Sequence, residues 1–157
     1  MPIAALQRAM GGPAPVPLPG ISVLSLGEVD PSAPKRAREA VLLQAVRLTD
    51  EAAPRTGVPG LRALAEELPD WEEQSDADRC FRLAAQVIEQ RGTGGGLFRR
   101  MYTQFLEEAG LPELSALCAR SADAFSALSQ RPLPERARAC AEAEEALWKR
   151  ALDLFEP

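Results

Sequence analysis

The stretch that decides the fold is ADRCFRLAAQVIEQRGTGGGLFRRMYTQFLEEA, residues 77–109, in which a glycine run separates two amphipathic segments. Apolar residues recur every three or four positions on both sides of the run, which is the period of one helix face. They are Cys80, Leu83, Ala84, Val87 and Ile88 before the run, and Phe98, Met101, Tyr102, Phe105 and Ala109 after it. We therefore predict two helices joined by the break, with Arg99 and Arg100 on the polar side of the second.

The same period continues on both sides of this stretch, between residues that start or stop helices. Apolar stripes run through residues 37–48, 61–68, 114–125 and 137–155, and short proline- or glycine-containing connections separate them. Short connections favour antiparallel neighbours. We predict a mostly α fold, a compact antiparallel array of about six helices. One of these helices ends at Pro69, and Trp71 lies in the linker that follows.

The N-terminal part of the chain differs in composition from the rest. Residues 11–20, GGPAPVPLPG, contain four prolines and should run extended. Ile21–Leu26 has the β-branched and apolar content of one short strand, which needs a pairing partner to be stable. We predict two parts: an extended Pro-rich arm with a short strand over residues 1–32, and a helical domain over residues 33–157.

Composition excludes several classes of function. The chain has 157 residues, a net charge of -5 and no histidine. Nucleic acid is not expected as a partner, because binding it requires clustered basic residues. No apolar run is long enough for a membrane span and no signal peptide is recognisable, so we expect a cytoplasmic protein.

The cysteines and the missing histidine narrow the chemistry further. Cys80, Cys118 and Cys140 are far apart in helical stretches and suggest neither disulfides nor a metal site. We expect them to be small buried hydrophobes. Without histidine, neither Cys-His nor Ser-His catalysis can arise within this chain.

The glycine run admits three interpretations. A nucleotide-binding loop fails, because the Lys-Ser/Thr ending of one motif and the preceding strand of the other are both absent. The run could instead bind a non-nucleotide phosphate, such as the phosphopantetheine arm of a carrier protein, at the start of the following helix. A tight turn or hinge without a ligand is the interpretation that the residues alone favour. The candidate ligand-binding residues are Gly92, Thr93, Gly94, Gly95, Gly96, Arg99 and Arg100.

Two further residues near the run are candidates for catalysis. Glu89 precedes the run and Tyr102, the only tyrosine of the chain, follows it. Glu89 could act as an acid or base, or form an ion pair with Arg99 or Arg100 across the break. The Tyr102 hydroxyl could be a general acid, or hydrogen-bond a buried partner.

Residues 88–109 resemble the signature of a bacterial domain of unknown function. Residues 57–71, GVPGLRALAEELPDW, and residues 3–9 are also similar to that domain. It usually follows a papain-like N-terminal domain in proteins similar to butirosin biosynthesis protein H. The resemblance implies acyl transfer in natural-product assembly, from an acyl carrier protein to the acceptor, with the nucleophilic cysteine and its histidine in the papain-like half.

These observations lead to one main functional hypothesis and two alternatives. The main one is an accessory or half-site module of a natural-product biosynthetic acyltransferase system, which binds a carrier-linked acyl group or a partner enzyme. The partner would be a papain-like protein, a carrier protein or a second copy of the chain. The alternatives are a self-sufficient small biosynthetic enzyme that uses Glu89 and Tyr102 in a helical pocket, and a purely structural dimerisation domain.

Overall fold

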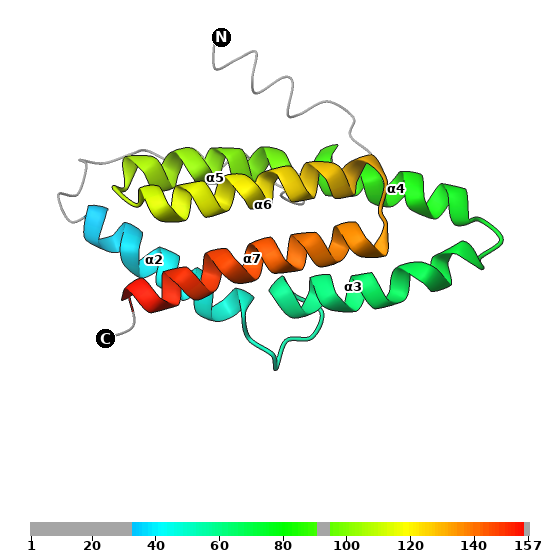
Figure 1. Ribbon diagram of the computed structural model, residues 1–157, viewed down its shortest axis with the longest axis horizontal. Coiled ribbons are helices and arrows are strands. Elements are labelled where there is room, and N and C mark those ends of the chain that lie inside the picture. Colours follow the sequence, from blue (N-terminus) through cyan, green and yellow to red (C-terminus); the bar gives the residue numbers. More distant parts are fainter. Residues whose placement is uncertain (1–32, 91–94, 156–157) are drawn as a thin grey trace, which may run out of the picture. The chain divides into compact units, whose positions relative to one another are not determined.

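A computed structural model describes residues 33–90 and 95–155, and these ranges form six helices (Figure 1). They are α2 (Ala33–Leu48), α3 (Gly57–Glu72), α4 (Ala77–Gln90), α5 (Gly96–Glu108), α6 (Pro112–Gln130) and α7 (Pro134–Phe155). The predicted mostly helical array is confirmed. The Pro-rich arm, the strand at Ile21–Leu26 and most of the glycine run lie outside the described residues. In the described ranges no helix is both long and apolar enough to cross a membrane.

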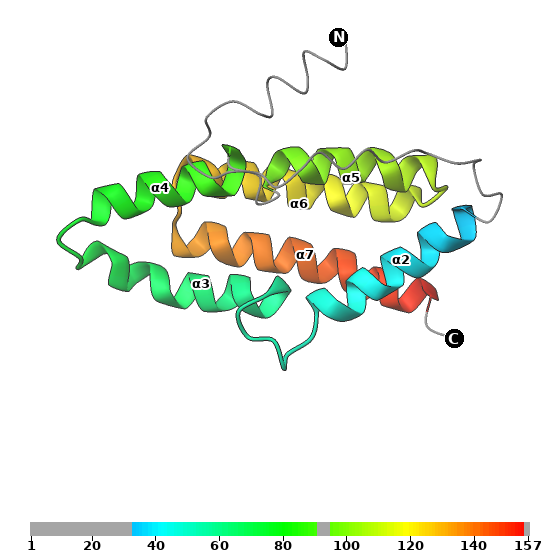
Figure 2. The ribbon, with the colours of Figure 1, turned by 180° about the vertical axis from the view of Figure 1, so that it is seen from behind.

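The two longest helices, α6 and α7, form an antiparallel hairpin on which the other helices pack. Helices α4 and α5 lie one after the other along α6, and α3 and α2 lie in the same way along α7 (Figures 1 and 2). The glycine run thus joins two helices that share α6 as their neighbour. Helices α5 and α2 thus lie along different helices of the hairpin, α5 along α6 and α2 along α7.

Buried apolar side chains form two separate clusters. The larger one comprises Val41, Ala45, Val58, Leu106, Leu111, Leu114, Cys118, Leu147, Trp148 and Ala151. The smaller one comprises Ala65, Leu68, Leu128, Ala137 and Cys140. Along α6 and α7, the positions between the two clusters hold two buried polar residues, Ser121 and Glu144. The core is therefore interrupted by polar groups that must be satisfied inside the protein.

The predicted apolar face of α5 is only partly the face that α5 buries. Phe98 and Met101 are 48% and 61% exposed, whereas Leu106, outside the predicted stripe, is fully buried against α6. Arg99, predicted on the outer side, has a side chain that is only 21% exposed. The prediction is wrong for Arg99, Phe98 and Met101, because the guanidinium of Arg99 pairs with groups inside the protein, whereas Tyr102 and Ala109 pack against the larger core cluster.

The start of α5 lies unusually close to its neighbours. A methyl group on Gly95 would overlap the backbone carbonyl of Ile88, and one on Gly96 would overlap the Ser126 hydroxyl and the Ala122 carbonyl. Both glycines are buried. Their lack of a side chain is what lets the helix approach α4 and α6, and close backbone packing alone explains these two positions.

Helix α3 continues through Pro69 to Glu72, so the predicted end at this proline is wrong. Trp71 lies in the last turn of the helix instead of in a linker. Its ring contacts Phe81 of α4 with centroids 5.9 Å apart, and it packs against the smaller core cluster. Burial of this large side chain together with Leu68 offsets the hydrogen bond that the proline removes.

The close approach at Gly96 yields a stability prediction. We expect Gly96→Ala to destabilise the protein by about 1–3 kcal/mol, because the added methyl has to displace a backbone carbonyl. Gln104→Ala, at an exposed position of the same helix, should stay within about 0.5 kcal/mol of the wild type. Urea unfolding followed by circular dichroism measures both changes, and equal stabilities of the two variants would contradict the packing argument.

Candidate functional site

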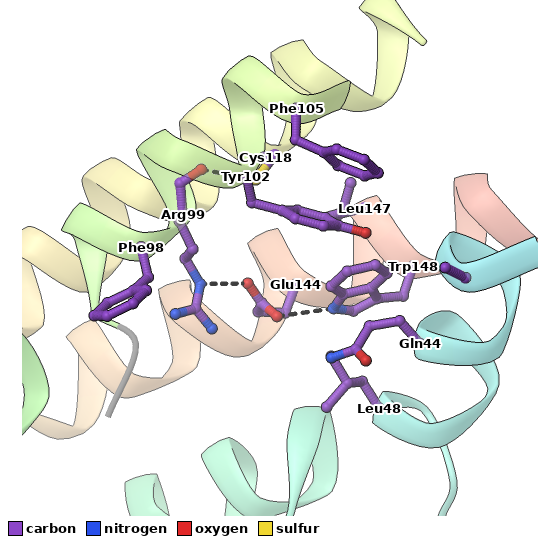
Figure 3. Close-up of a pocket in the computed structure, with 11 residues that line it drawn as sticks. Gln44, Leu48, Phe98, Arg99, Tyr102, Phe105, Cys118, Glu144, Leu147 and Trp148 are labelled. Carbon is purple, nitrogen blue, oxygen red and sulfur yellow. Dashed lines mark hydrogen bonds and ion pairs between the residues drawn. The ribbon is translucent and has the colours of Figure 1, made fainter. Parts of the chain in front are cut away.

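The carboxylate of Glu144 is the most buried charged group of the described chain. Glu144 is only 3% exposed and projects from the middle of α7 between the two core clusters. It accepts hydrogen bonds from Arg99 Nε at 2.7 Å and from Trp148 Nε1 at 2.8 Å (Figure 3). It also accepts one from the Ser121 hydroxyl. These three donors, one of which is the cation Arg99, compensate the cost of burying this charge.

Arg99 completes this network from α5. Its Nε also bonds the Ser121 hydroxyl, and its Nη1 donates to the carbonyl of Gly95 at 3.4 Å. The guanidinium carbon lies 3.4 Å from the ring centroid of Phe125, a cation–π contact. One side chain therefore connects α5 to both α6 and α7.

Beside this network lies a cavity of about 430 Å³. Its lining comes from four helices: Ala40, Gln44 and Leu48 of α2, Phe98, Arg99, Tyr102 and Phe105 of α5, Cys118 of α6, and Glu144, Leu147 and Trp148 of α7. Most of these side chains are aromatic or aliphatic, and Figure 3 shows the Arg99–Glu144 pair next to the aromatic rings. The volume and lining are typical of a site for a small organic ligand.

Tyr102 stands in the aromatic wall of the cavity. Its ring stacks on Phe105 with centroids 5.3 Å apart and lies 6.0 Å from the ring of Trp148. Burial raises the pKa of the hydroxyl to about 12, helped by the nearby Cys118 and Glu144. Within the described residues this hydroxyl forms no hydrogen bond to the protein, so it is a protonated donor available to a ligand.

The two buried thiols are not poised for nucleophilic chemistry. The Cys118 thiol donates to the Arg99 carbonyl at 3.3 Å, and burial raises its pKa. Burial also raises the pKa of Cys140, to about 12. Both side chains are thus protonated at neutral pH, whereas a nucleophilic cysteine must be a thiolate. In the described ranges no three His, Cys, Asp or Glu side chains gather to hold a metal ion.

Glu89 has a structural role at the glycine run. Its carboxylate accepts hydrogen bonds from the backbone N–H groups of Gly96 at 2.8 Å and Leu97 at 3.2 Å, so it caps the start of α5. This is the position where an external phosphate would bind. Arg100, beside it, bonds Asp123 and Ser126 of α6.

The predicted site residues are therefore only partly brought together. Arg99 and Tyr102 line the cavity, whereas Glu89 and Arg100 do not. Gly92, Thr93 and Gly94 lie outside the described residues, and a ligand-binding role for the glycine run stays a prediction.

Sequence reasoning missed the partners of Arg99. They include Ser121, Phe125 and Glu144, and Trp148 bonds Glu144 from the other side. The sequence contains one sign that Glu144 is buried. This residue falls on the apolar stripe of its helix, between Cys140 and Leu147. An acidic residue in a position that the helical period assigns to the core indicates a buried, paired carboxylate.

The buried pair should be among the most sensitive points of the fold. We expect Glu144→Ala to cost about 3–5 kcal/mol of unfolding free energy, because it leaves Arg99 buried without its counter-charge. Glu142→Ala, exposed on the same helix, should cost about 0.5 kcal/mol or less. Urea denaturation compares the two variants.

A double variant separates the charge effect from simple loss of packing. Arg99→Leu combined with Glu144→Leu removes both charges and should recover a large part of the stability lost in Glu144→Ala. If Glu144→Ala costs no more than Glu142→Ala, the carboxylate is not the structural centre described here.

The single tyrosine allows a direct titration. In the folded protein Tyr102 should ionise near pH 12, and in denaturant near pH 10. Because the folded pKa is the higher one, the stability linked to this group is intact below pH 10 and is lost as the pH rises toward 12. Tyrosinate absorbance measures both midpoints, and a folded midpoint near 10 would show an open, solvated ring.

Comparison with known proteins identifies a family. The model described as Domain of unknown function (DUF4872) matches residues 4–151, nearly the whole chain. No curated protein and no solved structure matches the chain. The predicted likeness to a domain of unknown function is confirmed by this match, and the chain belongs to the family Domain of unknown function (DUF4872).

Proposed function

We propose that the chain is an acyl-binding accessory or half-site module of a natural-product biosynthetic acyltransferase system. The cavity between α2, α5 and α7 carries this proposal. It would hold the acyl group while a carrier protein or a papain-like partner supplies the thioester and the catalytic residues. The acyl-transfer part rests on the resemblance of residues 88–109 to proteins similar to butirosin biosynthesis protein H.

The lining favours an acyl group over a strongly charged ligand. The walls are mostly apolar, and the charges of Arg99 and Glu144 already compensate each other at 2.7 Å. An aliphatic or aromatic chain would pack against Phe105, Leu147 and Trp148. The Tyr102 hydroxyl would donate to the acyl carbonyl, which fixes the orientation of the ligand.

The state of the polar groups favours binding over catalysis. Cys118 is a protonated thiol, Tyr102 holds its proton up to about pH 12, and Glu144 is bound by three donors. The chain also contains no histidine that could activate a nucleophile. A partner would therefore provide the nucleophile and the base.

An exposed apolar surface borders the cavity. Leu97, Phe98 and Met101 of α5 are each about half exposed or more, and Phe98 also lines the cavity. Exposed apolar patches of this kind are typical of protein contacts. The proposal assigns this face to the carrier protein or papain-like partner that delivers the acyl group.

The test uses Trp148 as a reporter, since it lines the cavity and Trp71 lies elsewhere. In a Trp71→Phe variant, butyryl and octanoyl thioesters of N-acetylcysteamine should change the fluorescence saturably. Tyr102→Phe should weaken binding about two- to tenfold, the effect of one neutral hydrogen bond.

A blocked cavity provides the matched control. Ala40→Phe fills the mouth from α2 and should abolish the response, whereas Ala116→Phe, exposed on α6, should leave it unchanged. The proposal would be contradicted if neither thioester gave a saturable response, or if Ala40→Phe bound them as the wild type does.

A further inference from the structure

A second concave surface lies between α3 and α4, away from the cavity described above. It encloses about 640 Å³ and shares no lining residue with that cavity. Its apolar lining includes Leu64, Trp71, Leu83, Ala84, Val87 and Ile88, and its polar lining includes Asp70 of α3 and Gln74 of the α3–α4 connection. The α3–α4 connection projects beyond the end of the α6–α7 hairpin (Figures 1 and 2).

Helix α4 is markedly amphipathic but poorly covered. From Ala77 to Glu89 no side chain is buried, and Leu83 is 47% exposed although it lies on the apolar face. An amphipathic helix in a globular protein normally buries its apolar stripe. Within the described residues, Leu83 is the exposed member of this stripe, and its other members are half-buried.

The net negative charge of the protein is concentrated on the segment that ends α3, forms the connection and begins α4, and Asp70 of this segment lines the groove itself. Residues 66–82 carry seven carboxylates and two arginines, so this segment has a net charge of -5, equal to that of the whole chain. The carboxylates are Glu66, Glu67, Asp70, Glu72, Glu73, Asp76 and Asp78. Among the described residues, only Glu67 of these seven forms an ion pair, with Arg55. An apolar groove formed by such an acidic segment favours an apolar and basic partner.

We propose that the α3–α4 groove is a docking site for an amphipathic helix of another protein, with an aliphatic face and Lys or Arg along its flanks. Two antiparallel helices form a trough into which a third helix can insert side chains at positions i, i+3, i+4 and i+7. The aliphatic face would cover Leu83, Val87 and Trp71. The basic flanks would pair with the carboxylates of α3 and of the connection to α4.

This site does not depend on acyl binding. The Ala40→Phe variant, which fills the cavity beside α2, should bind the helix as well as the wild type does. Failure of the acyl-binding proposal and failure of the docking proposal can therefore be told apart in the same protein preparation.

The test is fluorescence anisotropy of a labelled peptide with the full-length chain. The peptide has leucines at helical i, i+3, i+4 and i+7 spacing and lysines elsewhere, and we expect saturable binding in the micromolar range. A peptide of the same composition with its leucines spread around the helix should bind at least tenfold more weakly. A peptide with glutamates in place of the lysines should not bind.

Protein variants locate the binding surface. Leu83→Ser should weaken binding about tenfold, as loss of a central apolar contact does. Glu66→Gln, Asp70→Asn and Glu73→Gln together should weaken it about three- to tenfold. The control triple Glu39→Gln, Glu142→Gln and Asp153→Asn changes the net charge equally but elsewhere, and should have little effect. Circular dichroism confirms the fold of each variant.

Three results would overturn the proposal. The first is equal weakening by the two charge triples, which would show non-specific attraction. The second is no binding of the amphipathic lysine peptide. The third is concentration-dependent self-association that Leu83→Ser abolishes, as measured by light scattering, which would make a second copy of the chain the occupant of the groove.

Discussion

The buried ion pair between Arg99 and Glu144 is the interaction on which the rest of this structure depends. It joins α5 to α7, it includes Ser121 of α6, and it lies where the hydrophobic core divides into two clusters. A charge placed there is tolerated only because every donor and acceptor is matched. The same groups form the polar side of the cavity, so the stability of the three-helix core and the shape of the site are linked.

This pair also determines which face of α5 points outward. Once Arg99 is directed into the protein and Gly96 lies against α6, the neighbouring Phe98 cannot also face the core. Phe98 borders the cavity and Met101 faces solvent as a result. The exposed aromatic and aliphatic surface therefore follows from the inward position of Arg99 in the ion pair. The same orientation of α5 places exposed residues at the border of the cavity.

The helices themselves could be predicted from the sequence, because their period and their breakers are local properties. The stripes of α6 and α7 contain Leu114, Cys118, Ala137 and Trp148, all of which are buried. Gly110 and Pro112 mark the boundary between α5 and α6 as expected. The period also showed that Phe98 and Phe105 share a face.

The helical period does not show which face of α5 turns inward. That depends on Arg99, whose buried partner Glu144 lies 45 residues away in the sequence. The pairing of Arg99 with Glu144 is a tertiary property, and so is the packing of Trp71 that carries α3 past Pro69. The site was predicted at the glycine run because the sequence does not show these tertiary contacts. The tight approach of Gly95 and Gly96 is visible in the sequence only as glycines, and glycines are equally compatible with a ligand and with a neighbouring helix.

The position of α2 has a consequence for how the cavity exchanges its contents. This helix supplies three residues of the lining but none of the partners of Glu144, and Val41 and Ala45 are its fully buried side chains. Segments with few buried contacts open at a free energy far below that of global unfolding. Displacement of α2 alone would expose the aromatic wall, because Arg99, Glu144 and Ser121 hold α5, α6 and α7 together without it. A ligand would then reach the cavity while the rest of the fold stays intact.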